Sequence, residues 1–356
     1  MNGKITTRQL SLLIISGFFL TKIHVLPALM AGYVGESLCI PIIINFALDF
    51  LLLLLILPLI KDNETFLTLQ QTAFGEKGGK VVSFLYFLFF MIKAFVPIFE
   101  QDSAIELTFY ETQPLIIIFL PFFIVALFFI IKGYKAVIRS IEFCFPLFLI
   151  SIGIIFFLSF GEANFSSLLP VFSKSPKTLF KSAFLTLTWF GDPIYILFLA
   201  GQIKKSKNFN KSVFVSYAIC ISLTVVLFAL FYSVFDSIAE RQYFATLKMS
   251  KYSLTLSNIG RFDYISSMAL ILSSIFITTL PLIFASCSLN DCFSFKNKFV
   301  APIIVVAIQI ITSFVTEYHF LYSIQFVSKY LVYFLIIMTY VIPLIIFLKT
   351  KRSKNV

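Results

Sequence analysis

Two long apolar segments of the sequence each carry a charged residue beside residues that break helices. Lys22 lies five residues before Pro27 in the first segment, and Asp192 stands between Gly191 and Pro193 in the sixth. Proline removes a backbone donor and glycine relaxes the backbone, so both helices are predicted to break there. Backbone left unpaired at membrane depth is tolerated only where it packs in protein or lines a cavity. Because ionisable side chains at that depth are costly, the two charges predict a functional site.

Two chemistries are open for this pair of charges. A small zwitterion would present its carboxylate to Lys22 and its ammonium group to Asp192. Alternatively, the two side chains form a fixed salt bridge that replaces a coupling cation and locks the helices. A third interpretation is that Pro27 and Pro193 only kink two ordinary helices.

Side chains next to the breaks complete the predicted ligand site. Thr21 and Thr188 offer hydroxyl groups, and Trp189, Phe190 and Tyr195 offer aromatic walls. The predicted ligand-binding residues are Thr21, Lys22, Thr188, Phe190, Gly191, Asp192 and Tyr195.

Other ionisable residues in the apolar segments are interpreted as structural. Asp49 and Lys93 are a candidate buried pair on the second and third segments. Glu142 follows Arg139 by three residues, so the two share a helix face and predict a local ion pair. His24, alone on an apolar helix, is predicted to be a packed residue.

Composition places these residues in a membrane. Hydrophobic residues make up 59% of the 356 residues and charged residues 13%, whereas soluble domains are about half apolar and about a quarter charged. The apolar residues form runs of about 18–24, enough to cross the bilayer as helices. A soluble enzyme, a secreted disulfide scaffold and a disordered chain are excluded. The ten segments are approximately 10–32, 37–60, 81–100, 114–131, 138–160, 179–201, 212–235, 264–287, 299–316 and 327–348.

The basic residues predict the orientation. With the N-terminus inside, 18 of the 28 Lys and Arg residues fall on the cytoplasmic side and 7 on the outside, so both termini are predicted to be cytoplasmic. Two connecting segments are long enough to have structure. Residues 61–80 predict a short interfacial helix ending at Gly75, and residues 236–263 predict an external helical cap.

The sequence shows no signature of an enzyme or of a cofactor. There is no Walker A motif, no constellation of His and carboxylates for a metal, and no nucleophile–base motif. The five cysteines match neither a zinc site nor a disulfide framework. The net charge of +11 is spread over short loops and the C-terminus, which argues against nucleic-acid binding.

The two breaks are five segments apart, and this spacing predicts an architecture. Ten helices can form two inverted five-helix repeats, each starting with a broken helix, with the ligand site where the breaks meet. The prediction is a single all-α membrane domain, 1–356, of ten transmembrane helices with helices 1 and 6 broken. Its repeats would cover about 10–160 and about 179–348.

Four stretches of the sequence resemble the permease (B) subunits of bacterial spore-germination receptors. They are TTRQLSLLIISGFFLTKIHVLP, KGYKAVIRSIEFCFPLFLI, NFSSLLPVFSKSPKTLFKSAFLTLTWFGDP and IGRFDYISSMALILSS. Asn164, Leu168, Leu169 and Pro170, ahead of the sixth segment, are the most specific part of the resemblance. That family belongs to the amino acid/polyamine/organocation transporter superfamily, so the resemblance implies the amino-acid transporter type of inverted repeat.

The resemblance also implies a function. Members of the family detect small germinants, often amino acids, in the inner membrane of the dormant spore, together with an A subunit and a C lipoprotein subunit. A germinant-sensing subunit is therefore expected. A secondary transporter of amino acids or amines and a structural subunit with a vestigial pocket are the alternatives, because all three share one fold.

Overall fold

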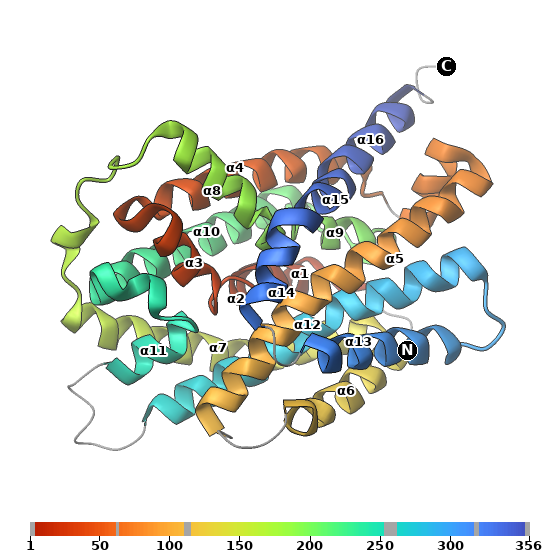
Figure 1. The fold of residues 1–356 in the computed structure, drawn as a ribbon. Coiled ribbons are helices and arrows are strands. Elements are labelled where there is room, and N and C mark those ends of the chain that lie inside the picture. Colours follow the sequence, from red (N-terminus) through yellow and green to blue (C-terminus); the bar gives the residue numbers. More distant parts are fainter. Residues whose placement is uncertain (1–3, 62–63, 110–114, 253–261, 317–319, 353–356) are drawn as a thin grey trace.

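The computed structural model describes residues 4–61, 64–109, 115–252, 262–316 and 320–352. Within these ranges the chain is helical apart from loops and two strands of two residues each. Long helices run across the molecule in similar directions, around the short helices α1, α2 and α9 near its centre (Figure 1). The predicted all-helical fold is confirmed.

The first half of the chain begins with a short strand and then contains a series of helices. In order these are β1 (Ile5–Thr6), α1 (Thr7–Leu12), the π-helical turn η1 (Leu13–Gly17), α2 (Phe18–Leu20), α3 (Leu26–Val34), η2 (Gly35–Ser37), α4 (Cys39–Ile56), η3 (Leu57–Leu59), α5 (Phe66–Phe109), α6 (Leu115–Lys132) and α7 (Tyr134–Glu162).

The second half contains the sixth apolar segment and the helices that follow it. In order these are η4 (Phe165–Leu168), α8 (Pro176–Thr186), η5 (Leu187–Trp189), α9 (Ile194–Phe198), β2 (Ile203–Lys204), α10 (Phe209–Phe235), η6 (Asp236–Arg241), α11 (Ala245–Tyr252), α12 (Phe262–Phe293), α13 (Val300–Thr316), α14 (Phe320–Phe326), η8 (Val327–Leu331), α15 (Val332–Ile336), η9 (Ile337–Val341) and α16 (Ile342–Arg352).

Helical structure covers every predicted apolar segment. In the described part of the chain, six helical stretches are long and apolar enough to cross a bilayer: Cys39–Leu59, Phe66–Glu106, Tyr134–Glu162, Phe209–Arg241, Met268–Phe293 and Tyr322–Lys351. Shorter apolar helices cover Thr7–Leu20, Leu120–Lys132 and Val300–Thr316. The remaining segment, 179–201, holds α8, η5 and α9, so it is interrupted as predicted.

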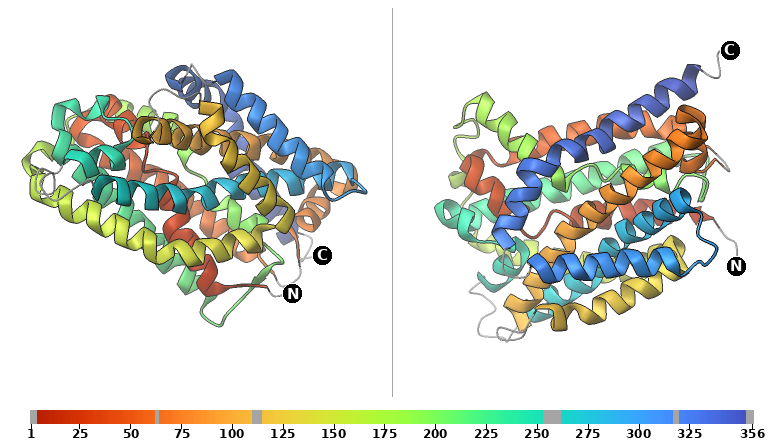
Figure 2. Two further views of the ribbon diagram at one scale, coloured as in Figure 1. Left: turned by 90° about the horizontal axis from the view of Figure 1, so that it is seen from below. Right: turned by 45° about the vertical axis from the view of Figure 1, so that its right-hand side comes forward.

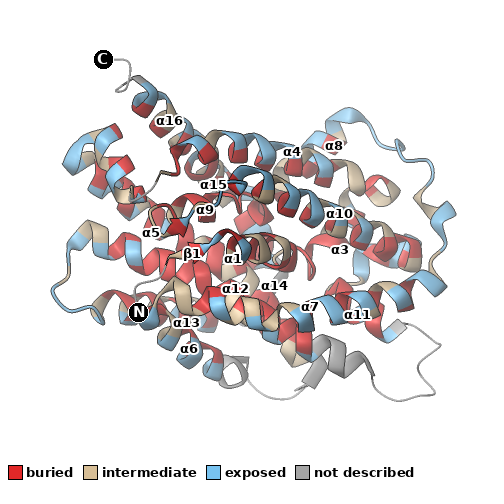
Figure 3. Ribbon diagram, turned by 180° about the vertical axis from the view of Figure 1, so that it is seen from behind, coloured by how far each residue is buried: buried red, intermediate tan, exposed pale blue. Residues whose placement is uncertain are grey.

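The outer helix faces expose large apolar side chains instead of charges. On α7, Phe143 is 85% exposed and Phe157 is 81% exposed. Buried residues concentrate on helices such as α9 and α12 in the interior of the bundle, while exposed residues line the outer faces (Figure 3). Because water would penalise such an apolar surface, these faces suit contact with lipid.

The two structured connections are confirmed where they are described. Gly75 has φ 76° and interrupts α5, so the predicted short helix does end there. This left-handed backbone is one that glycine adopts at little cost. In the predicted external cap, η6 and α11 form helical turns. Residues 253–261 of that cap lie outside the described residues.

One end of the bundle carries both β1 and the end of α16, and we call it the terminal end (Figure 2). Here β1 pairs in parallel with β2, so the start of the first segment is tied to the chain that follows the sixth. Arg8 and Gln9 both donate to Glu142 of α7. The predicted partner of Glu142, Arg139, is not its bonded partner, because a residue on another helix lies within reach.

Candidate ligand-binding site

The first break separates α2 from α3. Residues 21–25 are not helical, and Pro27 lies in the first turn of α3, where its missing N–H needs no partner. The carbonyl oxygen of Phe18 is left without its helical partner at this point. It accepts hydrogen bonds from Lys22 Nζ at 2.7 Å and from Thr21 Oγ1 at 3.0 Å. Two side chains of the same segment therefore satisfy this buried carbonyl, which lacks its helical partner.

The second break separates η5 from α9. Phe190 is extended and Gly191 has φ 85°, in the left-handed region that favours glycine. The backbone N–H of Gly191 lies 2.9 Å from both carboxylate oxygens of Asp49 on α4. Tyr340 of η9 donates to the same carboxylate at 2.8 Å. Other helices of the bundle therefore hold this break in place.

The two breaks meet through their charges. Lys22 Nζ forms an ion pair with Asp192 Oδ2, and Thr21 Oγ1 lies 3.3 Å from the same oxygen. The side chains of Lys22 and Asp192 are only 1% and 2% exposed. The Lys22 ammonium also lies 5.0 Å from the centre of the Phe190 ring, a cation–π distance. Of the two chemistries open from the sequence, this structure shows the internal salt bridge.

Lys93 of α5 adds a second ammonium group to the site. It donates to the carbonyl oxygens of Phe190 and of Thr188, the latter at 3.0 Å. Its Nζ also lies 3.9 Å from Asp192 Oδ1. The predicted pairing of Lys93 with Asp49 is wrong in detail, because each binds the sixth segment separately. Two buried ammonium groups thus stand opposite two buried carboxylates.

A small cavity lies between the breaks and α5. It is lined by Thr21, Ile92, Lys93, Val96, Pro97, Thr188, Trp189, Asp192, Tyr195, Val327 and Leu335, and its volume is about 20 Å³. That is room for about one water molecule and not for an amino acid. The Thr188 hydroxyl is buried at this cavity without a hydrogen-bond partner among the described residues. The site is therefore closed in this structure.

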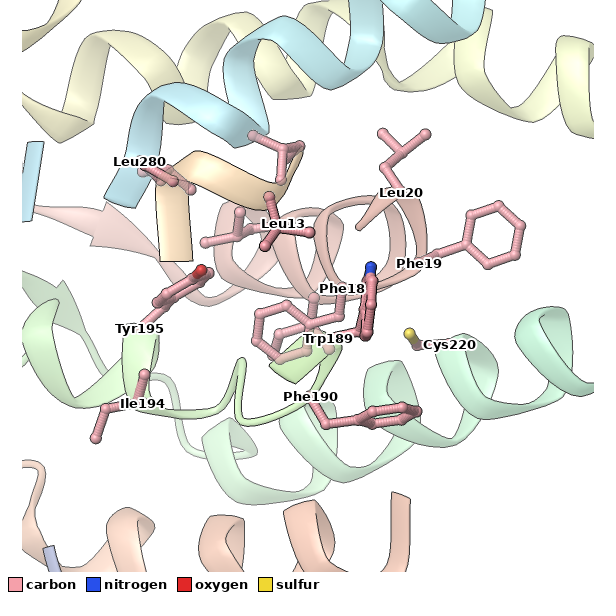
Figure 4. Close-up of a cluster of buried hydrophobic side chains, with 14 of the residues drawn as sticks. Leu13, Phe18, Phe19, Leu20, Trp189, Phe190, Ile194, Tyr195, Cys220 and Leu280 are labelled. Atoms are coloured by element: carbon pink, nitrogen blue, oxygen red, sulfur yellow. The ribbon is translucent and has the colours of Figure 1, made fainter. Parts of the chain in front are cut away.

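Aromatic side chains pack around the cavity. Figure 4 shows Phe18, Trp189 and Tyr195 grouped between the first segment and the unwound part of the sixth. The rings of Phe18 and Tyr195 meet edge to face at 6.3 Å. The indole nitrogen of Trp189 donates to Glu100 Oε1 of α5 at 2.7 Å. This bond anchors the sixth segment to α5 on the side of the cavity beyond Lys93.

The seven residues predicted from the sequence all lie at the junction of the breaks, but in different positions. Four of them line the cavity: Thr21, Thr188, Asp192 and Tyr195. Lys22 lies behind Asp192, and Gly191 offers its N–H to α4. The Phe190 ring packs against Phe46 at 5.1 Å and does not line the cavity.

Sequence reasoning missed four residues that hold the site together. Asp49, Lys93 and Glu100 bond directly to residues 188–191, and Tyr340 donates to the Asp49 carboxylate. Three of them carried a usable signal, because an ionisable group in a membrane segment points to a site. What the sequence lacked was the packing that places α4, α5 and η9 against the sixth segment.

Broken helices that meet around buried charges, inside a multi-pass helical bundle, define a membrane protein with a transporter type of fold. The chain is similar to the crystal structure of a mutant manganese transporter of Eremococcus coleocola, with a TM-score of 0.60. The match covers 94% of this chain and 77% of the transporter at 13% identity, so it shows the fold alone.

The family is shown by a second comparison. The spore germination protein family, also called spore permease, matches residues 4–321. The chain belongs to this family, and it is a multi-pass integral membrane protein. The predicted resemblance is thereby confirmed. A search of curated proteins finds no match.

Proposed function

We propose that this protein is the germinant-sensing transmembrane subunit of a spore germination receptor. It binds a small molecule, an amino acid, where the first and sixth helices break, and it signals to partner subunits. The observation that carries this proposal is the buried cluster of Lys22, Lys93 and Asp192 at the junction of the two breaks. Membership of the spore germination protein family supports the cellular role.

The proposed architecture is ten transmembrane helices in one domain, residues 1–356. Two inverted repeats of five helices would cover about 10–160 and about 179–348. The position of the breaks at the start of each half supports this arrangement, because inverted repeats place their broken helices at equivalent points. The likeness to a transporter over 94% of the chain supports it too.

An amino acid suits the charges of the closed site. Its carboxylate would accept from the ammonium groups of Lys22 and Lys93, and its ammonium group would donate to Asp192. Because a zwitterion brings one charge of each sign, every buried charge keeps a partner when Lys22 and Asp192 separate. The hydroxyl groups of Thr21 and Thr188, which line the cavity, would add hydrogen bonds.

Binding must change the conformation, because about 20 Å³ is too little space for an amino acid. The ligand would therefore bind an opened state in which Lys22 and Asp192 are apart. A ligand that binds this state tighter shifts the population by tenfold for each 1.4 kcal/mol or so. Binding coupled to opening is what a sensor requires.

The partners follow from the proposed role. The subunit would lie in the inner membrane of the spore with both termini in the cytoplasm, beside an A subunit and a C lipoprotein subunit. Opening at the breaks would move α1 and α2, whose start is tied through β1 to β2 at the terminal end. That tie gives the partners a way to detect the change.

Germination of mutant spores tests this function. Spores carrying Lys22→Met or Asp192→Asn would be exposed to a panel of amino acids, with this subunit and its partners measured by immunoblot. We expect normal subunit levels with a lost or right-shifted response to one germinant. Unchanged responses at normal subunit levels would refute the ligand site.

A secondary transporter of amino acids or amines is the alternative function, and the transporter fold favours it. Uptake of radiolabelled amino acids into proteoliposomes separates the two functions. A sensor shows binding with no accumulation, whereas a transporter accumulates substrate against its gradient.

A further inference from the structure

A second cavity lies at the terminal end of the bundle. Its volume is about 320 Å³, within the range of small-molecule sites, and it opens next to β2. The start of α5, the end of α9, the start of α7 and the last turns of α12 form its walls. Positive-inside counting predicts that this end faces the cytoplasm.

One carboxylate gives this cavity its charge. Asp291, near the end of α12, is the only charged residue among those that line it. Its carboxylate has no hydrogen bond or ion pair with another residue of the described ranges. The residue is partly buried, so water solvates the carboxylate incompletely. A carboxylate in this position favours a cation in the cavity.

Aromatic rings define which kind of cation fits. Phe66, Phe198 and Phe284 line the cavity; Phe66 lies 4.3 Å and Phe284 5.5 Å from Phe198, between ring centres. Ring faces attract organic cations and also bury their carbon atoms. An inorganic cation needs a shell of several oxygen ligands, and a single carboxylate with ring walls does not supply one. Gln70 and Gln202 also line this space, and the Gln70 amide oxygen already accepts from Ser83 Oγ at 2.8 Å.

Aromatic packing separates this cavity from the helix breaks. Tyr195 lines the small cavity at the breaks, and Phe284 lines the second cavity. Their rings lie 5.7 Å apart, and Phe90 packs against both, at 6.0 Å from Tyr195 and 5.3 Å from Phe284. The two cavities therefore share a wall of rings and no lining residue.

We propose that the second cavity is a binding site for a small organic ammonium ion that enters from the terminal end. Asp291 supplies the counter-charge, and the rings of Phe66, Phe198 and Phe284 enclose the carbon atoms. This site does not depend on the proposed function of the helix breaks.

Cys287 provides a direct readout, since it lines the cavity and is exposed. The other four cysteines, Cys39, Cys144, Cys220 and Cys292, would be replaced by alanine in the full-length protein. The rate at which a neutral maleimide modifies Cys287 would then be measured in detergent at pH 7.5. The probes are n-propylammonium chloride, 1-propanol as a neutral molecule of similar size, and potassium chloride at equal ionic strength.

We expect n-propylammonium to slow the modification at least threefold, with little effect of 1-propanol or potassium chloride. Asp291→Asn should abolish the protection, and Asp291→Glu should keep it. Asp236→Asn is the matched control, since Asp236 begins η6 and does not line the cavity. Asn tolerates the φ of 46° at this position, so the variant should fold and keep the protection. For each variant, the modification rate of Cys287 with n-propylammonium is divided by its rate without it. A change in the basal rate therefore does not affect the result.

Several outcomes would overturn the proposal. These are no protection by n-propylammonium, equal protection by potassium chloride, or protection that survives in a folded Asp291→Asn variant. Fluorescence of Trp189, the single tryptophan, reports on the helix breaks instead. A change in that fluorescence on adding n-propylammonium, lost in a folded Asp192→Asn variant, would place the probe at the carboxylate of the breaks and contradict a second site.

Discussion

The two helix breaks are satisfied in opposite ways. At the first break, Lys22 and Thr21 bond the free Phe18 carbonyl from within the same segment. At the second break, in the sixth segment, the groups that satisfy the backbone come from other helices. They are Asp49 on α4 and Lys93 on α5. One break carries its own polar partners, and the other depends on its neighbours.

This difference assigns the two breaks different parts in a conformational change. The second break is fixed to the bundle by side chains of other helices. If those side chains moved away, buried backbone groups would lose their hydrogen bonds, which is costly at membrane depth. The first keeps its own hydrogen bonds if it moves, and its polar link to the second is the contact of Thr21 and Lys22 with Asp192. We therefore expect the second break to stay fixed during the conformational change and the first break to move.

Removing Lys93 should have the largest effect. Lys93→Met leaves the carbonyls of Thr188 and Phe190 unpaired and unbalances the buried charges. We expect the free energy of unfolding to fall by about 3–5 kcal/mol, the usual result of breaking a buried ionic cluster. Thermal unfolding of the purified protein in detergent measures it.

A double variant sharpens this result. In Lys93→Met with Asp49→Asn, one charge of each sign is removed, so the combined loss should be smaller than the sum of the single losses. For coupled sites, the loss in the double variant differs from the sum of the single losses by about 0.5–3 kcal/mol. Strictly additive losses of unfolding free energy would show that the charges at the second break do not act together.

Gly191→Ala should come next. A Cβ there would lie 2.6 Å from Thr339 Cγ2, and the φ of 85° disfavours any side chain. The backbone alone costs about 1–3 kcal/mol, and displacing Thr339 adds to it. Gly161→Ala on α7 is the control, since nothing lies within 4 Å of its Cβ. Equal unfolding temperatures for the two variants would contradict a rigid second break.

Lys22→Met should cost less than Lys93→Met. Thr21 still donates to the Phe18 carbonyl, and Asp192 keeps Lys93 nearby. We expect a loss of about 1.5–3 kcal/mol, the value of a hydrogen bond to a charged group. The same unfolding assay measures both lysine variants. A larger loss for Lys22→Met would reverse the comparison of the two breaks.

The smallest effect is expected at the terminal end. Arg8 is 76% exposed in its ion pair with Glu142, so Glu142→Gln should change stability by about 0–1 kcal/mol. The difference from wild type should shrink further in high salt because the pair is screened. A loss above about 2 kcal/mol would show that this pair contributes more than an exposed one.

The sequence was sufficient for the helical elements and for the positions of the two breaks, but not for the residues that hold those breaks in place. Gly191, Pro193 and Pro27 mark the breaks, because their backbone effects are local and do not depend on the rest of the fold. Asp49 was assigned to Lys93, whereas it bonds Gly191. Which helices pack side by side is a property of the whole bundle, and no local pattern encodes it.

The central claim is that an amino acid separates Lys22 from Asp192 at the breaks, and Trp189 allows a direct test. It is the only tryptophan, and it lines the cavity. The purified protein would be titrated with each of the twenty amino acids while its fluorescence is recorded. We predict a saturable change with the amino acid that germinates the spores, and none in a folded Asp192→Asn variant. An unchanged spectrum with every amino acid, or an identical titration in that variant, would contradict the account.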